Sequence, residues 1–123
     1  MSLDIIFAEF GSRDKANQKW ENPIGRLDPT YQSVKAYFPD ANIICYSDDE
    51  SIGDGYDVEV RHIDSDSTPF DKNYKEGSGK LKWGYHCCDY YQIKGLLEST
   101  ADVAIAMDSD LMFVSDEVRT LIP

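Results

Sequence analysis

The chain has 123 residues and a formal net charge of −11, because 12 Lys and Arg residues stand against 23 Asp and Glu residues. Its length suits one domain, and its 41% hydrophobic content indicates a packed core rather than a disordered chain. The acidic excess argues against a nucleic-acid partner, because such proteins neutralise phosphates with Lys and Arg. It is compatible with a bound divalent cation.

Targeting and redox features are few. No apolar run is long enough to span a bilayer, and the first ten residues lack the basic start of a signal peptide. The three cysteines, Cys45, Cys87 and Cys88, are an odd number and do not form a disulfide framework. We therefore expect a cytoplasmic protein with no transmembrane segment.

The first half of the chain predicts strands and one helix. Apolar runs with β-branched residues predict buried strands at 3–10 and 42–46, and alternation over 56–63 predicts an edge strand. A polar loop is expected over 11–28. Asp28 as N-cap and Pro29 then predict a helix start, and this helix is expected to bury Tyr31, Val34 and Phe38 on one face.

The second half predicts one long helix and one more buried strand. After a polar loop over 64–79, a helix is expected over 80–99, and tight packing on the sheet would explain why its glycines are tolerated. A buried strand is expected at 102–107, an extended segment at 111–114 and a short helix capped by Ser115. The long helix is expected to bury Trp83, Cys87, Tyr90, Ile93 and Leu97.

This alternation predicts a single α/β domain over 1–123, built on an open, mostly parallel sheet between two helical layers. In such sheets, ligands bind outside the carboxyl ends of the strands. Three polar segments are expected at that edge: the loop over 11–13, the pair Asp48 and Asp49, and the sequence Asp108-Ser109-Asp110.

Asp108 and Asp110 follow an apolar strand and precede an apolar stretch. Desolvating two neighbouring carboxylates raises their pKa values unless a cation compensates their charge. A hard cation such as Mn²⁺ or Mg²⁺ suits carboxylate oxygens and keeps positions open for phosphate oxygens. The alternative is structural, with Asp108 capping a turn and Asp110 facing water.

The stretch DVAIAMDSDLMFV over 102–114 resembles the D-x-D segment of GT-A-fold glycosyltransferases, which follows four hydrophobic residues and precedes three. The similarity is greatest to the glycogenin-like and galactosyltransferase branch, in which a helix bearing lysine or arginine precedes the motif strand, as Lys80-Leu81-Lys82 does here. The resemblance implies a Rossmann-like nucleotide-diphospho-sugar transferase fold. It also implies metal-dependent transfer from a nucleoside-diphosphate sugar, a UDP-sugar above all, with Mn²⁺ or Mg²⁺ as cofactor.

The resemblance also assigns roles to residues. Asp110 would bind the metal, Asp108 would contact the metal or the ribose, and Ser109 between them is counted with the donor-binding residues. The nucleobase would lie near Ala8, Glu9, Phe10, Asp48 and Asp49. The candidate contacts to the diphosphate or ribose are Arg13, Lys80 and Lys82, each of which could equally be a solvated surface cation.

Glycosyltransferases of this family place the acceptor site, the catalytic carboxylate and a further metal ligand such as His after the motif. Only 13 residues follow Asp110, and neither His62 nor His86 lies where that histidine belongs. We therefore expect either the donor-binding half of a longer enzyme or a reduced relative that does not transfer sugar unaided. The acceptor and the catalytic residue are not identified.

Two other functions are compatible with the pattern. The first is a nucleotide-binding, metal-binding or interaction domain without catalysis. The second is a haloacid-dehalogenase-like phosphotransfer domain, which also begins with Asp-x-Asp after an apolar strand. That family needs a Ser or Thr, a Lys and further acids downstream, and no Lys follows Asp110 in the sequence.

Overall fold

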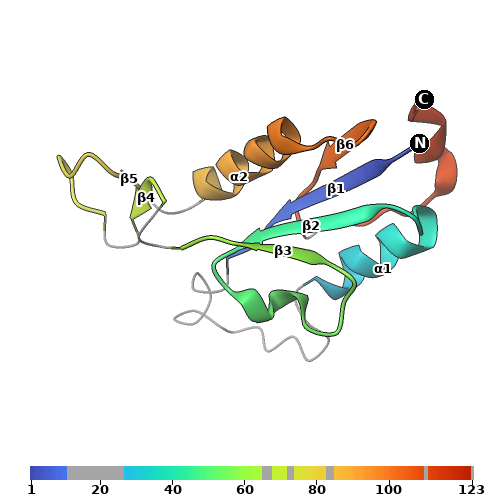
Figure 1. Ribbon diagram of the computed structural model, residues 1–123, viewed down its shortest axis with the longest axis horizontal. Coiled ribbons are helices and arrows are strands. Elements are labelled where there is room, and N and C mark those ends of the chain that lie inside the picture. The colour runs from blue at the N-terminus through green and yellow to red at the C-terminus, as the bar shows by residue number, and fades with distance from the viewer. Residues whose placement is uncertain (11–26, 65–67, 72–73, 83–84, 110, 123) are drawn as a thin grey trace.

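The computed structural model describes residues 1–10, 27–64, 68–71, 74–82, 85–109 and 111–122, and shows an α/β fold (Figure 1). Four parallel strands form the main sheet in the order β3-β2-β1-β6. They are β1 (Leu3–Ala8), β2 (Asn42–Ser47), β3 (Glu59–His62) and β6 (Val103–Ala106). The two α-helices are α1 (Asp28–Tyr37) and α2 (Tyr85–Glu98). The smaller elements are the parallel pair β4 (Phe70–Asp71) and β5 (Leu81–Lys82), and the 3₁₀ helices η2 (Glu50–Gly53) and η3 (Asp116–Leu121).

Helices cover both faces of the sheet, as the alternation of elements predicts. β1 is buried on both faces, and its successive side chains enter two different cores. Ile5 packs with Val34 of α1, whereas Ile6 packs with Cys87 and Tyr91 of α2. The expected three layers, helix, sheet and helix, are therefore present.

The helix α1 follows its sequence signals closely. Val34 is fully buried, and Tyr31 and Phe38 pack against the same core. The N-cap is Leu27 rather than Asp28, so the helix begins one residue earlier than expected. The Asp28 carboxylate accepts hydrogen bonds from Gln32 and from the Tyr56 hydroxyl instead of capping the helix.

The helix α2 differs from the prediction in its start and in its buried face. It begins at Tyr85 rather than at residue 80, because Leu81 and Lys82 pair with β4. Over residues 87–98, where burial is described, its buried residues are Cys87, Tyr91 and Gly95, which recur every four residues. The expected positions Tyr90, Ile93 and Leu97 are 43%, 57% and 82% exposed. The expectation for these three residues is wrong, since α2 is apolar on two sides. Trp83 lies outside the described residues.

Tight packing at Gly95, expected from the sequence, is confirmed. A Cβ atom at this position would lie 2.6 Å from Ile6 Cγ2 and 3.0 Å from Tyr46 Cε2. The close approach brings α2 onto β1 and β2, and therefore decides which face of the helix is buried.

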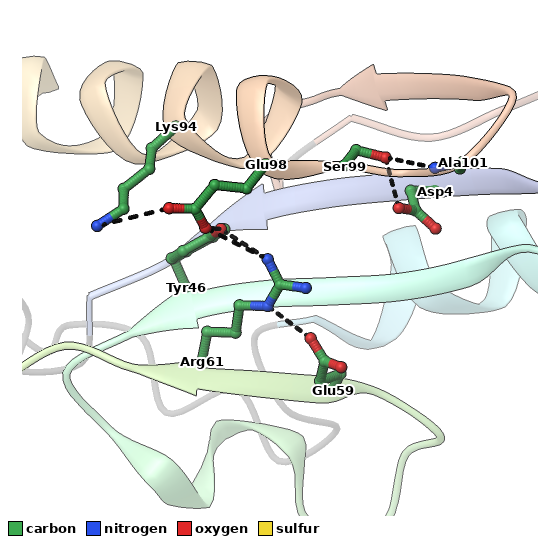
Figure 2. Close-up of polar contacts among 8 residues, drawn as sticks. All are labelled: Asp4, Tyr46, Glu59, Arg61, Lys94, Glu98, Ser99 and Ala101. Atoms are coloured by element: carbon green, nitrogen blue, oxygen red, sulfur yellow. Dashed lines mark hydrogen bonds and ion pairs between the residues drawn. The ribbon is translucent and has the colours of Figure 1, made fainter.

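A polar cluster joins α2 to the sheet beside this contact (Figure 2). The Tyr46 hydroxyl donates to Glu98 at 2.9 Å and accepts from Arg61 Nη1 at 2.9 Å. Arg61 also donates Nε–H to Glu59 at 2.6 Å. Burial of the phenol raises the pKa of Tyr46, so the phenol stays protonated and remains a donor to Glu98. The cluster links strands β2 and β3 to α2.

The remaining expectations differ from the structure in detail. The strands expected at 3–10, 56–63 and 102–107 are shorter at one or both ends. Residues 111–114 form no strand. Ser115 caps the last helical segment as expected, by accepting from Glu117 N–H, although that segment is a 3₁₀ helix. Over the described ranges, no helix has the length and apolar character needed to cross a membrane.

Candidate functional site

The carboxyl ends of β2, β1 and β6 lie side by side at one edge of the sheet (Figure 1). Ala8 is in register with Tyr46, and Glu9 N–H donates to the Tyr46 carbonyl at 2.9 Å. On the other side of β1, Met107 N–H donates to the Ile6 carbonyl at 3.0 Å. The predicted residues at the end of β1 therefore lie between the acidic segment after β2 and the Asp108 segment after β6.

Three elements hold the segment Asp108-Ser109. The Ser109 hydroxyl donates to the Glu9 carboxylate at the end of β1, and Thr30 Oγ1–H of α1 donates to the Ser109 carbonyl. Gln92 of α2 donates Nε2–H to Asp108 Oδ1 at 2.9 Å. One predicted metal ligand and two predicted donor-binding residues thus lie together.

The structure changes one part of the electrostatic argument for the acid pair. The Asp108 side chain is exposed. Its charge is therefore hydrated, and the expectation of a costly desolvation at the end of the strand is wrong for this residue. Asp110, the second predicted metal ligand, lies outside the described residues.

The segment after β2 is ordered by its own hydrogen bonds. Asp49 is the N-cap of η2, where Oδ1 accepts from Ser51 N–H at 3.0 Å and from Ser51 Oγ–H at 2.6 Å. Asp49 N–H donates to Ser47 Oγ, which is fully buried. The Asp49 carboxylate therefore caps η2, a role that the sequence pattern did not predict. The neighbouring Asp48 is partly exposed at the same edge of the sheet.

The predicted cations are not gathered around Asp108. Lys80 and Lys82 are exposed, and they lie at or next to β5, outside any helix. Lys80 donates to the Thr68 carbonyl at 3.2 Å. In the described part of the chain, neither lysine forms a hydrogen bond or ion pair with Asp108. The small β4-β5 sheet nevertheless lies toward the end of the molecule where the main strands finish (Figure 1). Arg13 lies outside the described residues.

The number and kind of possible metal ligands near Asp108 limit which ion the site could hold. Among the described residues, no three His, Cys, Asp or Glu side chains come together as a metal-binding group. Mg²⁺ sites, however, use only one or two protein carboxylates and complete their coordination with water and substrate phosphates. Asp108 provides one exposed carboxylate, and carboxylate oxygens are suitable ligands for Mn²⁺ as well as Mg²⁺. Of the residues that the structure describes, Asp108 alone is thus a candidate ligand, and it would suit an open site whose other ligands are water and phosphate oxygens.

A hollow of about 380 Å³ lies elsewhere, at the amino-terminal edge of the sheet. It is lined mainly by apolar side chains together with Asp40 and Arg119. Arg119 donates Nε–H to the Tyr37 carbonyl and packs over the Phe38 ring. Because this arginine is engaged within the fold and the hollow is remote from the strand ends that bind ligands in α/β sheets, we do not assign the site there.

Two residues of the site have no signal in the sequence. Thr30 and Gln92 both contact the Asp108-Ser109 segment from helices, 79 and 16 positions away from their respective partners. Nothing in a helical repeat indicates which polar side chain will meet a loop from another strand. Their roles become visible only when the helices are docked on the sheet.

Comparisons with protein-family models, curated protein sequences and solved structures find no match to this chain.

Proposed function

We propose that this domain binds a nucleoside-diphosphate sugar through a divalent cation, as the donor-binding part of a metal-dependent glycosyltransferase with a nucleotide-diphospho-sugar transferase type of fold. The observation that carries the proposal is the Asp108-Ser109 segment at the carboxyl edge of a parallel sheet, hydrogen-bonded to Glu9, Thr30 and Gln92. Strand ends at this edge are where α/β sheets bind ligands, and an immobilised acidic segment there is suited to a metal-phosphate group.

Each part of the donor has candidate residues. Asp108 and Asp110 are proposed to hold Mn²⁺ or Mg²⁺, which when bound would stabilise negative charge on the departing diphosphate as a Lewis acid. The nucleobase would lie over the end of β1, near Glu9 and Asp48, where a carboxylate accepts the imide N–H of uracil. A UDP-sugar is therefore the proposed donor.

The positively charged candidates would have a different role. Arg13, Lys80 and Lys82 are proposed to contact the diphosphate or the ribose, because cationic side chains form strong hydrogen bonds with phosphate oxygens. The β4-β5 sheet would have to bring its exposed lysines toward the donor, so their effect on affinity is expected to be smaller than that of the acids.

The proposal is tested by thermal unfolding with UDP or UDP-sugars, with and without Mn²⁺. A ligand at 100 times its dissociation constant stabilises the native state by about 2.7 kcal/mol, which raises the melting temperature by several degrees. We expect this rise only when nucleotide and metal are both present. The variants Asp108→Asn and Asp110→Asn should abolish it.

Asp102 provides a matched control, because it precedes β6 at the opposite end of the strand. Asp102→Asn should change the melting temperature of the free protein but keep the ligand-induced rise. No rise with any nucleotide and metal would refute the proposed function. Binding without donor hydrolysis would favour a donor-binding half that does not transfer sugar unaided.

A further inference from the structure

The side chain of Gln92 bridges α2 and the segment that follows β6. Its Nε2 atom donates to Asp108 Oδ1 at 2.9 Å and lies 3.3 Å from the Met107 carbonyl oxygen, also as a donor. A primary amide has two N–H groups, so one nitrogen can serve both acceptors. Gln92 therefore fixes the backbone and the carboxylate of two consecutive residues.

The base of this bridge is rigid. Gln92 follows Tyr91, which is 5% exposed and whose hydroxyl shares a 2.7 Å hydrogen bond with Thr68. One turn further along α2, Gly95 packs against Ile6 and Tyr46, so closely that an added Cβ would lie 2.6 Å from Ile6 Cγ2. This close packing, together with the Tyr91–Thr68 hydrogen bond, gives the Gln92 amide a defined position relative to β6.

The bridge leaves half of the Asp108 carboxylate for a ligand. Gln92 occupies Oδ1, while Oδ2 has no hydrogen-bond partner among the described residues, and the side chain is exposed. A hydrogen bond to one oxygen restricts the rotation of the carboxylate and so orients the other oxygen. Partners of this kind behind a metal ligand commonly change metal affinity 10–100-fold when they are removed.

We propose that Gln92 is a positioning residue, which orients Asp108 for the divalent cation through α2. This inference rests on the proposed function, since it concerns the same metal site. It adds that the affinity for the cation depends on how α2 is docked on the sheet, although α2 supplies no metal ligand to the site as proposed.

The test measures the Mn²⁺ affinity of each variant in the presence of UDP by electron paramagnetic resonance of free Mn²⁺. The melting temperature of the free protein shows whether each variant is folded. Gln92→Met keeps the length of the side chain and removes the donor. Gln92→Asn keeps the amide but is one methylene too short to reach. Both variants should bind Mn²⁺ 10–100-fold more weakly than the wild type.

Gln32→Met is the matched control, because Gln32 is also a helix amide that donates to a carboxylate, that of Asp28 at 3.4 Å. It should leave Mn²⁺ affinity unchanged. If both Gln92 variants fold and bind Mn²⁺ as tightly as the wild type, while Asp108→Asn binds none, the positioning role is refuted and the metal site stands. If the wild type itself binds no Mn²⁺ with UDP, the proposed function fails and this inference fails with it.

Discussion

Replacing Gly95 by alanine tests the packing that sets the position of α2. Gly95 is buried where the helix crosses β1, and an added Cβ would meet Ile6 Cγ2 at 2.6 Å. Ordinary van der Waals contact begins at 3.4 Å, so about 0.8 Å must be absorbed. The Ile6 side chain is fully buried and branched at Cβ, and therefore has little freedom to move away.

The expected effect is a balance of two terms. Alanine is favoured over glycine in a helix interior by about 1 kcal/mol, whereas overpacking a dense core costs typically 1–3 kcal/mol. Because the contact with Ile6 is too short for side chains to tolerate without a shift, we place this cost at the upper end of the range. We therefore expect Gly95→Ala to lower the free energy of unfolding by about 1–2 kcal/mol.

Urea denaturation of a double-mutant cycle measures this directly. Ile6→Ala alone should cost about 2–5 kcal/mol because it opens a cavity, but it also removes the atoms that clash. Gly95→Ala should then be neutral or stabilising in the Ile6→Ala background, with a coupling energy of at least about 1 kcal/mol. The variant Asp89→Ala, at an exposed position of the same helix, controls for helix propensity.

A Gly95→Ala variant at least as stable as the wild type, with no coupling to Ile6, would refute the close packing of α2 on β1. In that case the defined position of Gln92 would lose its basis as well.

Two further predictions concern the second face of α2 and an acid near the chain start. Leu97→Ser should change the free energy of unfolding by no more than about 0.5 kcal/mol, because this side chain is 82% exposed. Tyr91→Ala should cost about 3 kcal/mol or more in the same urea titration, because Tyr91 is buried. Similar losses for the two variants would show that the face of α2 that carries Leu97 is buried as well. The pKa of Asp102 is lowered, first by a hydrogen bond from the Ser2 backbone N–H and second by one from the Ser2 hydroxyl. The charged carboxylate therefore stabilises the fold above the unfolded-state pKa of about 3.9. This contribution to stability is lost as the pH falls through the lowered pKa of the folded state. Carboxyl carbon NMR should show the low pKa in the native protein, and Ser2→Ala, which removes only the hydroxyl, should move it upward in part. An unchanged pKa of Asp102 in that variant would contradict the contribution of the hydroxyl.

Much of the fold follows from local patterns in the sequence. Apolar β-branched runs identify β1, β2 and β6, because strands buried on both faces need side chains of this type on both sides. Pro29 and the spacing of Val34 and Phe38 identify α1. The parallel pairing of β1 with β2 then follows from the crossover through α1, whereas α2 leads from the edge strand β3 to β6 at the opposite edge of the sheet.

The buried face of α2 could not be read in this way. The helix carries apolar residues on two faces, and periodicity alone cannot decide which one meets the sheet. The spacing favours Tyr90, Ile93 and Leu97 besides Cys87, whereas Cys87 meets the sheet together with Tyr91 and Gly95. A glycine adds nothing to a hydrophobic pattern, yet only its missing Cβ lets the helix approach Ile6.

The candidate site, too, is predictable from the sequence only in part. Asp108 is predicted from the sequence because it follows an apolar strand, and parallel strands present their carboxyl ends at one edge. Glu9 is predicted because the resemblance of the motif implies that the end of the first strand lies near the nucleobase. Which side chains orient them depends on distances between elements remote in the chain. Only the docking of α1 and α2 brings Thr30 to the Ser109 carbonyl and Gln92 to the Asp108 carboxylate, since a hydrogen bond requires a separation of about 3 Å that no sequence spacing encodes.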